Sequence, residues 1–447
     1  MPFLSGRKNG IGSALAGLIL GTAVMLSGCV GDDVASRFNT DPSQPETGLT
    51  TDNSGALAEH PDEGGQIISD LRLRQSILPQ GGTFGQIAAG ALQTSSGAAA
   101  AELRIARLKA QARATNWLPS VGPSVNLTSL SGLVASILVE AALFDNGRKK
   151  AERAFAAADV ELAAVSLADE LNTRVYDALV AYVTSQRALA QMQIDQGAIV
   201  QLTEFQRIMR VRVDGGLSDL SEQQIIDQQV AEMQATLSAD ARTAEVASAE
   251  LAMLYGAPVT GLTGMDALPE DTPAPEPLAV LQARGQAAQR VAEAQINRAD
   301  LLPGLSAQAN IGEEGIDTGL VLGAGQMMGL GTADSLEALA SVQDLSSRQV
   351  AEAAQEARRK IDGLQNDMET LALRAAQGAD VLTQTSGNLA MFTEQYKVGR
   401  RSLLELVSEH DRHARLARDQ AALAYEIVLK RLAIAHARGV LVDGAQM

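Results

Sequence analysis

Apolar and small residues in the middle of the chain recur at alternating intervals of three and four positions. This spacing is the seam of a coiled coil, in which a helix packs on its neighbours along its length. Proline is absent between Pro123 and Pro258 and after Pro303. Because proline breaks a helix interior at a cost of about 3 kcal/mol, these tracts predict very long helices. The seam positions are Val160, Ala164, Leu167, Leu171, Val175, Ala178, Tyr182, Ser185 and Leu189.

The helices are predicted in two pairs, each a long helix that turns back into a shorter one. The long helices are expected at 148–214 and 333–398, and the returning helices at 217–255 and 401–438. At 1.5 Å per residue, each long helix spans about 100 Å. A protein with such helices is mainly α.

A different pattern precedes each long helix. In residues 120–143 and 304–329, apolar residues alternate with small or polar ones. Such alternation is typical of membrane strands with one face toward lipid and one toward a lumen, and each strand needs about 9–11 residues. Each window is therefore predicted to hold one β-hairpin. A soluble hairpin remains the alternative, and a helical run is a further alternative for residues 133–144.

The two halves of the sequence repeat one unit. The Leu-Pro pair at 118–119 recurs at 302–303, and Gly216 recurs at nearly the same interval as Gly399. Two hairpins give four strands per chain, which cannot close a barrel, and an open sheet edge is not tolerated in lipid. Three copies would supply twelve strands, within the size range of membrane barrels. The predicted fold is thus a long coiled-coil helical barrel joined to a trimeric β-barrel, with internal duplication.

These patterns divide the chain into six segments. Both repeats contain a hairpin, a long helix, a tip and a return helix, and the first repeat also begins with a helix. The segments are a signal peptide (1–28), a flexible tether (29–82), the first repeat (83–258), a proline-rich linker (259–276), the second repeat (277–439) and a C-terminal tail (440–447).

The amino end has the form of a bacterial export signal. Arg7 and Lys8 precede an uncharged apolar stretch, followed by Leu-Ser-Gly-Cys at 26–29. This ending resembles a lipobox, so Cys29, the only cysteine, is predicted to carry the lipid. In the lipoproteins that this ending resembles, an aspartate directly after the cysteine often signals retention at the inner membrane. Val30 occupies that position here, which favours the outer membrane. The alternative is an ordinary signal peptide with an incidental cysteine.

Composition narrows the function classes. The formal net charge of −17 argues against nucleic acid, whose partners carry a basic surface. Aromatic residues make up only 3% of the chain, which favours long packed helices over a globular core.

No motif for catalysis is recognisable in the sequence. A Ser/His/Asp set, a phosphate loop and a zinc motif are all missing, so we predict a protein that is not an enzyme and needs no cofactor or metal. His410 and His413 could form a metal pair three residues apart. Because His413 falls on the seven-residue line through Leu406 and Ile427, a packing role is favoured.

Three segments carry a family resemblance. Residues 143–148 (Leu-Phe-Asp-Asn-Gly-Arg) resemble the strand-to-helix junction of the TolC-type outer-membrane efflux and secretion proteins. Residues 396–406 resemble their second periplasmic tip turn, and residues 216–220 resemble the first. Two departures stand out: Gly-Leu-Gly-Thr at 329–332 replaces a second junction motif, and Asp-Gly-Gly at 214–216 is looser than the usual turn.

The resemblance implies a homotrimeric duct, lipid-anchored in the outer membrane and extending into the periplasm. The tip would dock a periplasmic adaptor, which links the duct to an inner-membrane pump in a tripartite efflux or type I secretion system. The pump would supply the energy, and this chain a passive channel. By the same resemblance, the junction at the membrane interface consists of Phe144, Asp145 and Gly147.

The tips are the predicted functional site. Acidic residues near them, Asp219, Glu222 and Glu405, are candidates to line the lumen, where three copies would form a carboxylate ring that repels anions. Alternatively, they lie on solvated helix faces. The residues predicted to dock the adaptor are Gly216, Leu217, Ser218, Gly399, Arg400, Arg401 and Ser402.

Two other classes compete with the channel. A non-channel coiled-coil lipoprotein that serves as a periplasmic scaffold would use the helices but lack the membrane hairpins. A periplasmic adaptor also uses long helical hairpins, but it needs flanking β-rich domains, which this sequence lacks.

Overall fold

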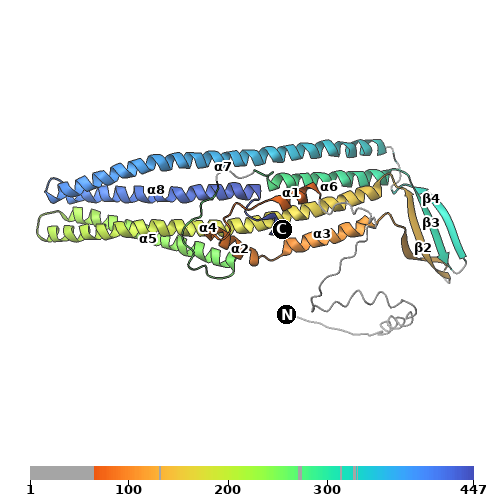
Figure 1. Cartoon of the computed structure of the whole chain (residues 1–447), viewed down its shortest axis with the longest axis horizontal. Coiled ribbons are helices and arrows are strands. Elements are labelled where there is room, and N and C mark those ends of the chain that lie inside the picture. Colours follow the sequence, from red (N-terminus) through yellow and green to blue (C-terminus); the bar gives the residue numbers. More distant parts are fainter. Residues whose placement is uncertain are drawn as a thin grey trace, which may run out of the picture. The chain divides into compact units, whose positions relative to one another are not determined.

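Two helical hairpins run side by side, as the seam predicts (Figure 1). In the computed structural model, helix α4 (Arg148–Asp214) turns back into α5 (Leu220–Tyr255), and α7 (Thr332–Lys397) turns back into α8 (Leu403–Arg438). The two hairpins touch chiefly through α4 and α8. The predicted bounds of the long helices are confirmed to within one residue.

The structure describes residues 65–129, 132–269, 274–312, 315–325, 329 and 331–446. The predicted signal peptide and Cys29 lie outside these ranges. All described residues belong to the unit Pro61–Met447. None of the described helices is both long and apolar enough to cross a membrane.

The predicted seam of α4 lies in the interior of this unit. All of its positions are buried except Val160, which is half-buried, and Leu189, which is exposed. Much of the buried face consists of alanine, which lets neighbouring helices approach closely. Shorter helices pack on the same long helix: α1 (Gln66–Leu73), α2 (Thr83–Gln93), α3 (Ala98–Ala114) and α6 (Leu278–Leu301).

One antiparallel sheet of four strands adjoins the start of α4 (Figure 1). It consists of β1 (Ser120–Ser129), β2 (Gly132–Phe144), β3 (Gly304–Gly312) and β4 (Gly315–Gly323), hydrogen-bonded in that order. Both predicted hairpins are therefore present, and a helical run at 133–144 is wrong. The second hairpin ends at Gly323, before the end of its predicted window.

The order of elements confirms the internal duplication. The first half runs α3, β1, β2, α4, α5, and the second runs α6, β3, β4, α7, α8. Each half thus contains a helix, a strand pair, a long helix and a shorter return helix. Because β2 pairs with β3, the two halves share one sheet.

The ends of the described chain are packed more firmly than expected for a tether and a tail. Helix α1 buries Ile67, Ile68 and Leu71, although it belongs to the segment predicted as a tether. The backbone N–H of Ile77 donates to the carbonyl of Val440 (3.0 Å), within the predicted tail. Both segments pack because each contains a short apolar run, between Ile67 and Leu78 in the first and from Val440 to Val442 in the second.

Candidate functional site

The strand register sorts the sheet into two faces, because side chains alternate along each strand. Val121 lies opposite Val139, and Ile311 opposite Ile316, so one face is apolar. Glu140 lies opposite Gln308, and Asn310 opposite Asp317, on the other face. That second face is mostly polar or small, and its apolar members include Leu138 and Val321.

The apolar face has no protein cover within the described chain. The side chains of Ile316, Leu320 and Leu322 are exposed, the last to 75%. Strand β4, and β1 at the opposite edge, each have only one neighbouring strand among the described residues. A sheet with a bare apolar face and two open edges is incomplete as a water-soluble structure.

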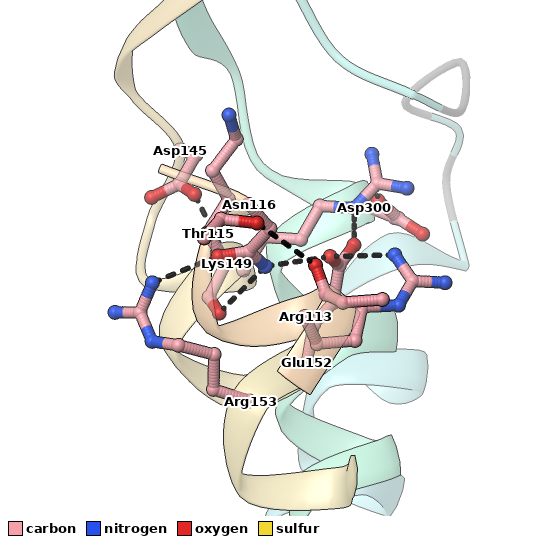
Figure 2. A network of polar contacts seen from close by, with 10 residues as sticks. Arg113, Thr115, Asn116, Asp145, Lys149, Glu152, Arg153 and Asp300 are labelled. Carbon is pink, nitrogen blue, oxygen red and sulfur yellow. Dashed lines mark hydrogen bonds and ion pairs between the residues drawn. The ribbon is translucent and has the colours of Figure 1, made fainter. Parts of the chain in front are cut away.

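Polar contacts fix the junction between the sheet and α4 (Figure 2). The carboxylate of Asp145 accepts from the backbone N–H groups of Gly147 (3.1 Å) and Lys149 (2.8 Å). Asn146 and Gly147 both adopt positive φ, which reverses the chain between strand and helix. Phe144, just before this turn, is exposed. The three predicted junction residues therefore lie together at the end of β2.

Both tip turns have the same hydrogen-bonding pattern, the Schellman motif. At the first, Leu217 N–H donates to the Arg212 carbonyl (2.7 Å) around Gly216, whose φ is +70°. At the second, Arg400 N–H donates to the Gln395 carbonyl (2.8 Å) around Gly399, whose φ is +73°. Glycine adopts this left-handed conformation without a steric penalty.

The second tip is held by its own side chains. Ser402 caps α8 in a capping box with Glu405: the Glu405 backbone N–H donates to the Ser402 hydroxyl, and the Glu405 carboxylate accepts from the Ser402 backbone N–H. Arg401 pairs with Glu405 (2.7 Å) and lies 4.4 Å from the centre of the Phe392 ring. Hydrogen bonds from Ser402, first the backbone N–H, and from Arg401 lower the pKa of Glu405.

The first tip has fewer side-chain hydrogen bonds than the second. Asp219 precedes α5 but makes no capping hydrogen bond with its side chain, and Arg212 donates to the Ser218 hydroxyl (3.1 Å). Leu217 is 74% exposed, and Leu220 is also exposed. This turn therefore presents apolar side chains to its surroundings.

The structure brings the two tips together. Leu202 and Met209 of α4, Ile226 of α5 and Leu403 and Leu406 of α8 belong to one buried cluster near both turns. Of the acidic candidates, Asp219 is exposed, Glu222 is half-buried, and Glu405 serves the capping box.

A buried ionic cluster lies where α4, α5 and α8 meet, and the sequence analysis missed it. Arg418 of α8 is bonded to Asp195 of α4 and to Asp240 of α5. Asp195 is only 1% exposed, and burial raises its pKa although Arg418 opposes the shift. Charged residues on otherwise apolar helix faces were the available signal, but their partners lie far away in the sequence.

One member of the histidine pair, His410, packs on an aromatic ring. The ring of His410 lies edge-on to Phe205 at 5.6 Å, and burial, followed by the nearby His413, lowers its pKa. Within the part of the chain that the structure describes, no group of three His, Cys, Asp or Glu residues is placed to hold a metal ion.

No protein-family model and no curated protein matches this sequence. Solved structures do. The chain superposes with a TM-score of 0.70 on the outer membrane protein VceC from Vibrio cholerae, at 16% identity, with 82% of this chain and 99% of VceC covered. Superposition on a membrane protein from Pseudomonas aeruginosa gives a TM-score of 0.71 at 14% identity, with 89% of this chain and 98% of that protein covered. The open-state MtrE outer membrane channel from Neisseria gonorrhoeae gives a TM-score of 0.64 at 16% identity, with 90% of this chain and 99% of MtrE covered.

The chain has the TolC-like fold of outer-membrane channels. The fold that the junction and tip segments suggested is thereby confirmed, and the neighbours are described as membrane proteins or channels. This fold accounts for the long helices, the small sheet and the duplication together.

Proposed function

We propose that three copies of this chain form a passive exit duct across the outer membrane. The observation that carries the proposal is the sheet: its apolar face is exposed, its other face is largely polar, and both edges are open. Closing three such sheets into one barrel of twelve strands pairs every edge and puts the apolar face in lipid.

Three of the solved structures with this fold are described as outer membrane channels by name: CmeC, OprN and MtrE. The same function in this chain gives the helices their role. The long hairpins would continue the barrel into the periplasm as a helical tube. A coiled-coil scaffold without strands does not agree with the four-stranded sheet.

The tips are the proposed docking site for a periplasmic adaptor linked to an inner-membrane pump. Leu217 and Leu220 at the first tip offer apolar contacts, and Arg400 at the second offers an exposed charge. In this proposal Asp219 and Glu222 favour cations in the lumen. An acyl chain on Cys29 would add an anchor but would not span the bilayer.

One strand supplies the test of the barrel. Leu320 lies on the apolar face of β4, and Gly319 beside it lies on the other face, with open space around it. An arginine facing lipid near mid-bilayer costs about 2–4 kcal/mol, whereas one facing a lumen stays in water. Leu320→Arg should therefore reduce the trimer in outer-membrane fractions, whereas Gly319→Arg should insert and change single-channel conductance.

Two outcomes would refute the duct. One is a folded, monodisperse monomer of the unaltered chain in mild detergent. The other is equal insertion of the Leu320→Arg and Gly319→Arg proteins together with no conductance from the unaltered protein in planar bilayers.

A further inference from the structure

A group of cationic side chains lies beside the sheet, at the start of α4. Residues 148–153 read Arg-Lys-Lys-Ala-Glu-Arg, and Arg113 at the end of α3 lies next to them. This concentration contrasts with the net charge of −17 for the whole chain. It also lies at the positive end of the α4 dipole, where cations are unfavourable.

The acidic groups in this region are already engaged (Figure 2). Glu152 pairs with Arg113 and Arg148, both at 3.2 Å, and Asp300 pairs with Arg148 at 3.2 Å. The carboxylate of Asp145 accepts from backbone N–H groups of the turn and α4. The helix N-terminus is therefore already occupied by the protein itself.

Three cations remain without a carboxylate partner among the described residues: Lys149, Lys150 and Arg153. Arg153 donates to the side-chain oxygen of Asn116 (2.8 Å), which holds it beside α3. Asn116 in turn donates to Glu152 (3.0 Å) and to the Lys149 carbonyl (3.1 Å). These bonds fix the backbone that carries the cations and leave their positive charge uncompensated.

Exposed aromatic residues flank the same cations. Trp117, three residues before β1, is 66% exposed, and Phe144 at the end of β2 is also exposed. Aromatic rings next to lysine and arginine are typical of the membrane–water interface. The equivalent start of α7 is different, because its first turn contains Asp334 and no cation. The basic site therefore belongs to one of the two junctions only.

We propose that Lys149, Lys150 and Arg153 bind the phosphate of an anionic phospholipid in the periplasmic leaflet, with Trp117 at the level of the headgroups. This inference rests on the proposed duct, which places the sheet in the membrane. The lipid phosphate supplies the negative charge that these three cations do not receive from a carboxylate of the protein. The site would fix the depth of the sheet in the bilayer.

The protein contains its own reporter, because Trp117 is its only tryptophan. The full-length protein would be reconstituted into vesicles that contain brominated phosphatidylglycerol or brominated phosphatidylcholine, and tryptophan quenching would be measured. A cation near a membrane surface contributes about a fivefold preference for anionic lipid. We expect the stronger quenching by brominated phosphatidylglycerol to weaken as salt rises.

The Lys149→Gln/Lys150→Gln variant should lose most of this preference. Glutamine and lysine have similar helix propensities, so α4 should keep its fold. The control is Arg359→Gln/Lys360→Gln, which removes two exposed cations roughly 40 Å along α7 and should keep the preference.

Each other result overturns a defined part of the proposal. Equal quenching by both lipids refutes the anionic site and leaves the duct intact. A preference that survives in the Lys149→Gln/Lys150→Gln protein refutes the residue assignment. Loss of the preference with inorganic phosphate, but not with chloride at equal ionic strength, indicates a soluble-anion site instead. Absence of quenching by either lipid contradicts the membrane sheet, and with it the proposed function.

Discussion

The two helical hairpins arose from one repeated unit, yet they occupy different positions in the protein. Helix α4 is buried along most of its length by α3, α5, α6 and α8. Helix α7 has almost the same length, but its buried residues are confined to Ser346, Ala357, Ile361 and Thr385. Helix α4 thus lies in the interior of this unit, and helix α7 lies at its edge.

The exposed side of α7 carries apolar residues that the interior helix would bury. Leu345, Leu373 and Met391 are all exposed. In the proposed trimer, this side would pack on a neighbouring copy. The comparison shows that the duplication preserved the length and the turn of each hairpin while their surroundings diverged.

The two tip turns also share a backbone conformation but differ in their side-chain contacts. Both are Schellman turns around glycine, but the second is stabilised by a capping box and by Arg401, whereas Asp219 at the first makes no capping hydrogen bond with its side chain. Both turns leave an apolar side chain exposed, Leu217 at the first tip and Val398 at the second, so the tips differ in their side-chain caps. Four predictions test this comparison.

The largest effect is expected where the hairpins are linked. Arg418→Met removes the cation between Asp195 and Asp240 and leaves two carboxylates buried together. Breaking a buried ion pair costs about 3–5 kcal/mol, so the free energy of unfolding should fall by that amount in denaturant titrations. Arg358→Met, at an exposed site on α7, should have little effect.

Adding Asp195→Asn and Asp240→Asn to Arg418→Met should recover much of the lost stability, because no unpaired charge would remain buried. If Arg418→Met costs no more than Arg358→Met, the two hairpins are joined by apolar packing alone.

A smaller effect is expected at the turn glycines. Gly216→Val and Gly399→Val each force a branched residue into positive φ, at about 2 kcal/mol. The sheet lies at the other end of the helices, so the trimer should still insert while adaptor pull-down is lost. Gly387→Val within α7, where φ is ordinary and space is open, is the control. Loss of the Gly399→Val trimer from the membrane with adaptor binding intact would show the docking assignment to be wrong.

Substituting the residue that precedes each return helix should reveal a smaller difference in stability between the two tips. Ser402→Ala removes the capping box of α8 and should cost about 1 kcal/mol in thermal or denaturant unfolding. Asp219→Ala should cost less, because Asp219 makes no capping hydrogen bond with its side chain. Equal losses at both positions would mean that the tips are held in the same way.

The smallest effect concerns pH. His436 of α8 lies 3.0 Å from the Thr173 hydroxyl and stacks on Tyr176 of α4, and burial lowers its pKa from 6.5. As pH falls below 6.5, the unfolded chain takes up this proton first, so stability declines until the folded-state pKa is reached. Burial lowers the pKa of His410 in the same direction.

Melting temperatures between pH 5 and pH 8 would measure this dependence. The His410→Gln/His436→Gln protein should show a flatter profile than the unaltered protein. An unchanged slope would mean that other groups control the stability in acid.

The sequence by itself determined the helices, the hairpins and the repeat, because each is specified by a local pattern. Seam spacing and missing prolines set α4 and α7, strand alternation set the two hairpins, and glycine marked the turns at Gly216 and Gly399. The same short segments around the junction and the tips were enough to suggest the fold.

Only the tertiary structure decided which of the two long helices is interior, and which charges meet. Asp195, Asp240 and Arg418 lie on three different helices, so no local pattern joins them. The cations at the start of α4 are left without carboxylate partners because Glu152 and Asp300 pair with neighbouring arginines and Asp145 accepts from backbone N–H groups. None of these pairings can be read from the local sequence. The physical reason is that burial and charge pairing depend on residues distant in sequence, whereas helices, strands and turns depend on near neighbours.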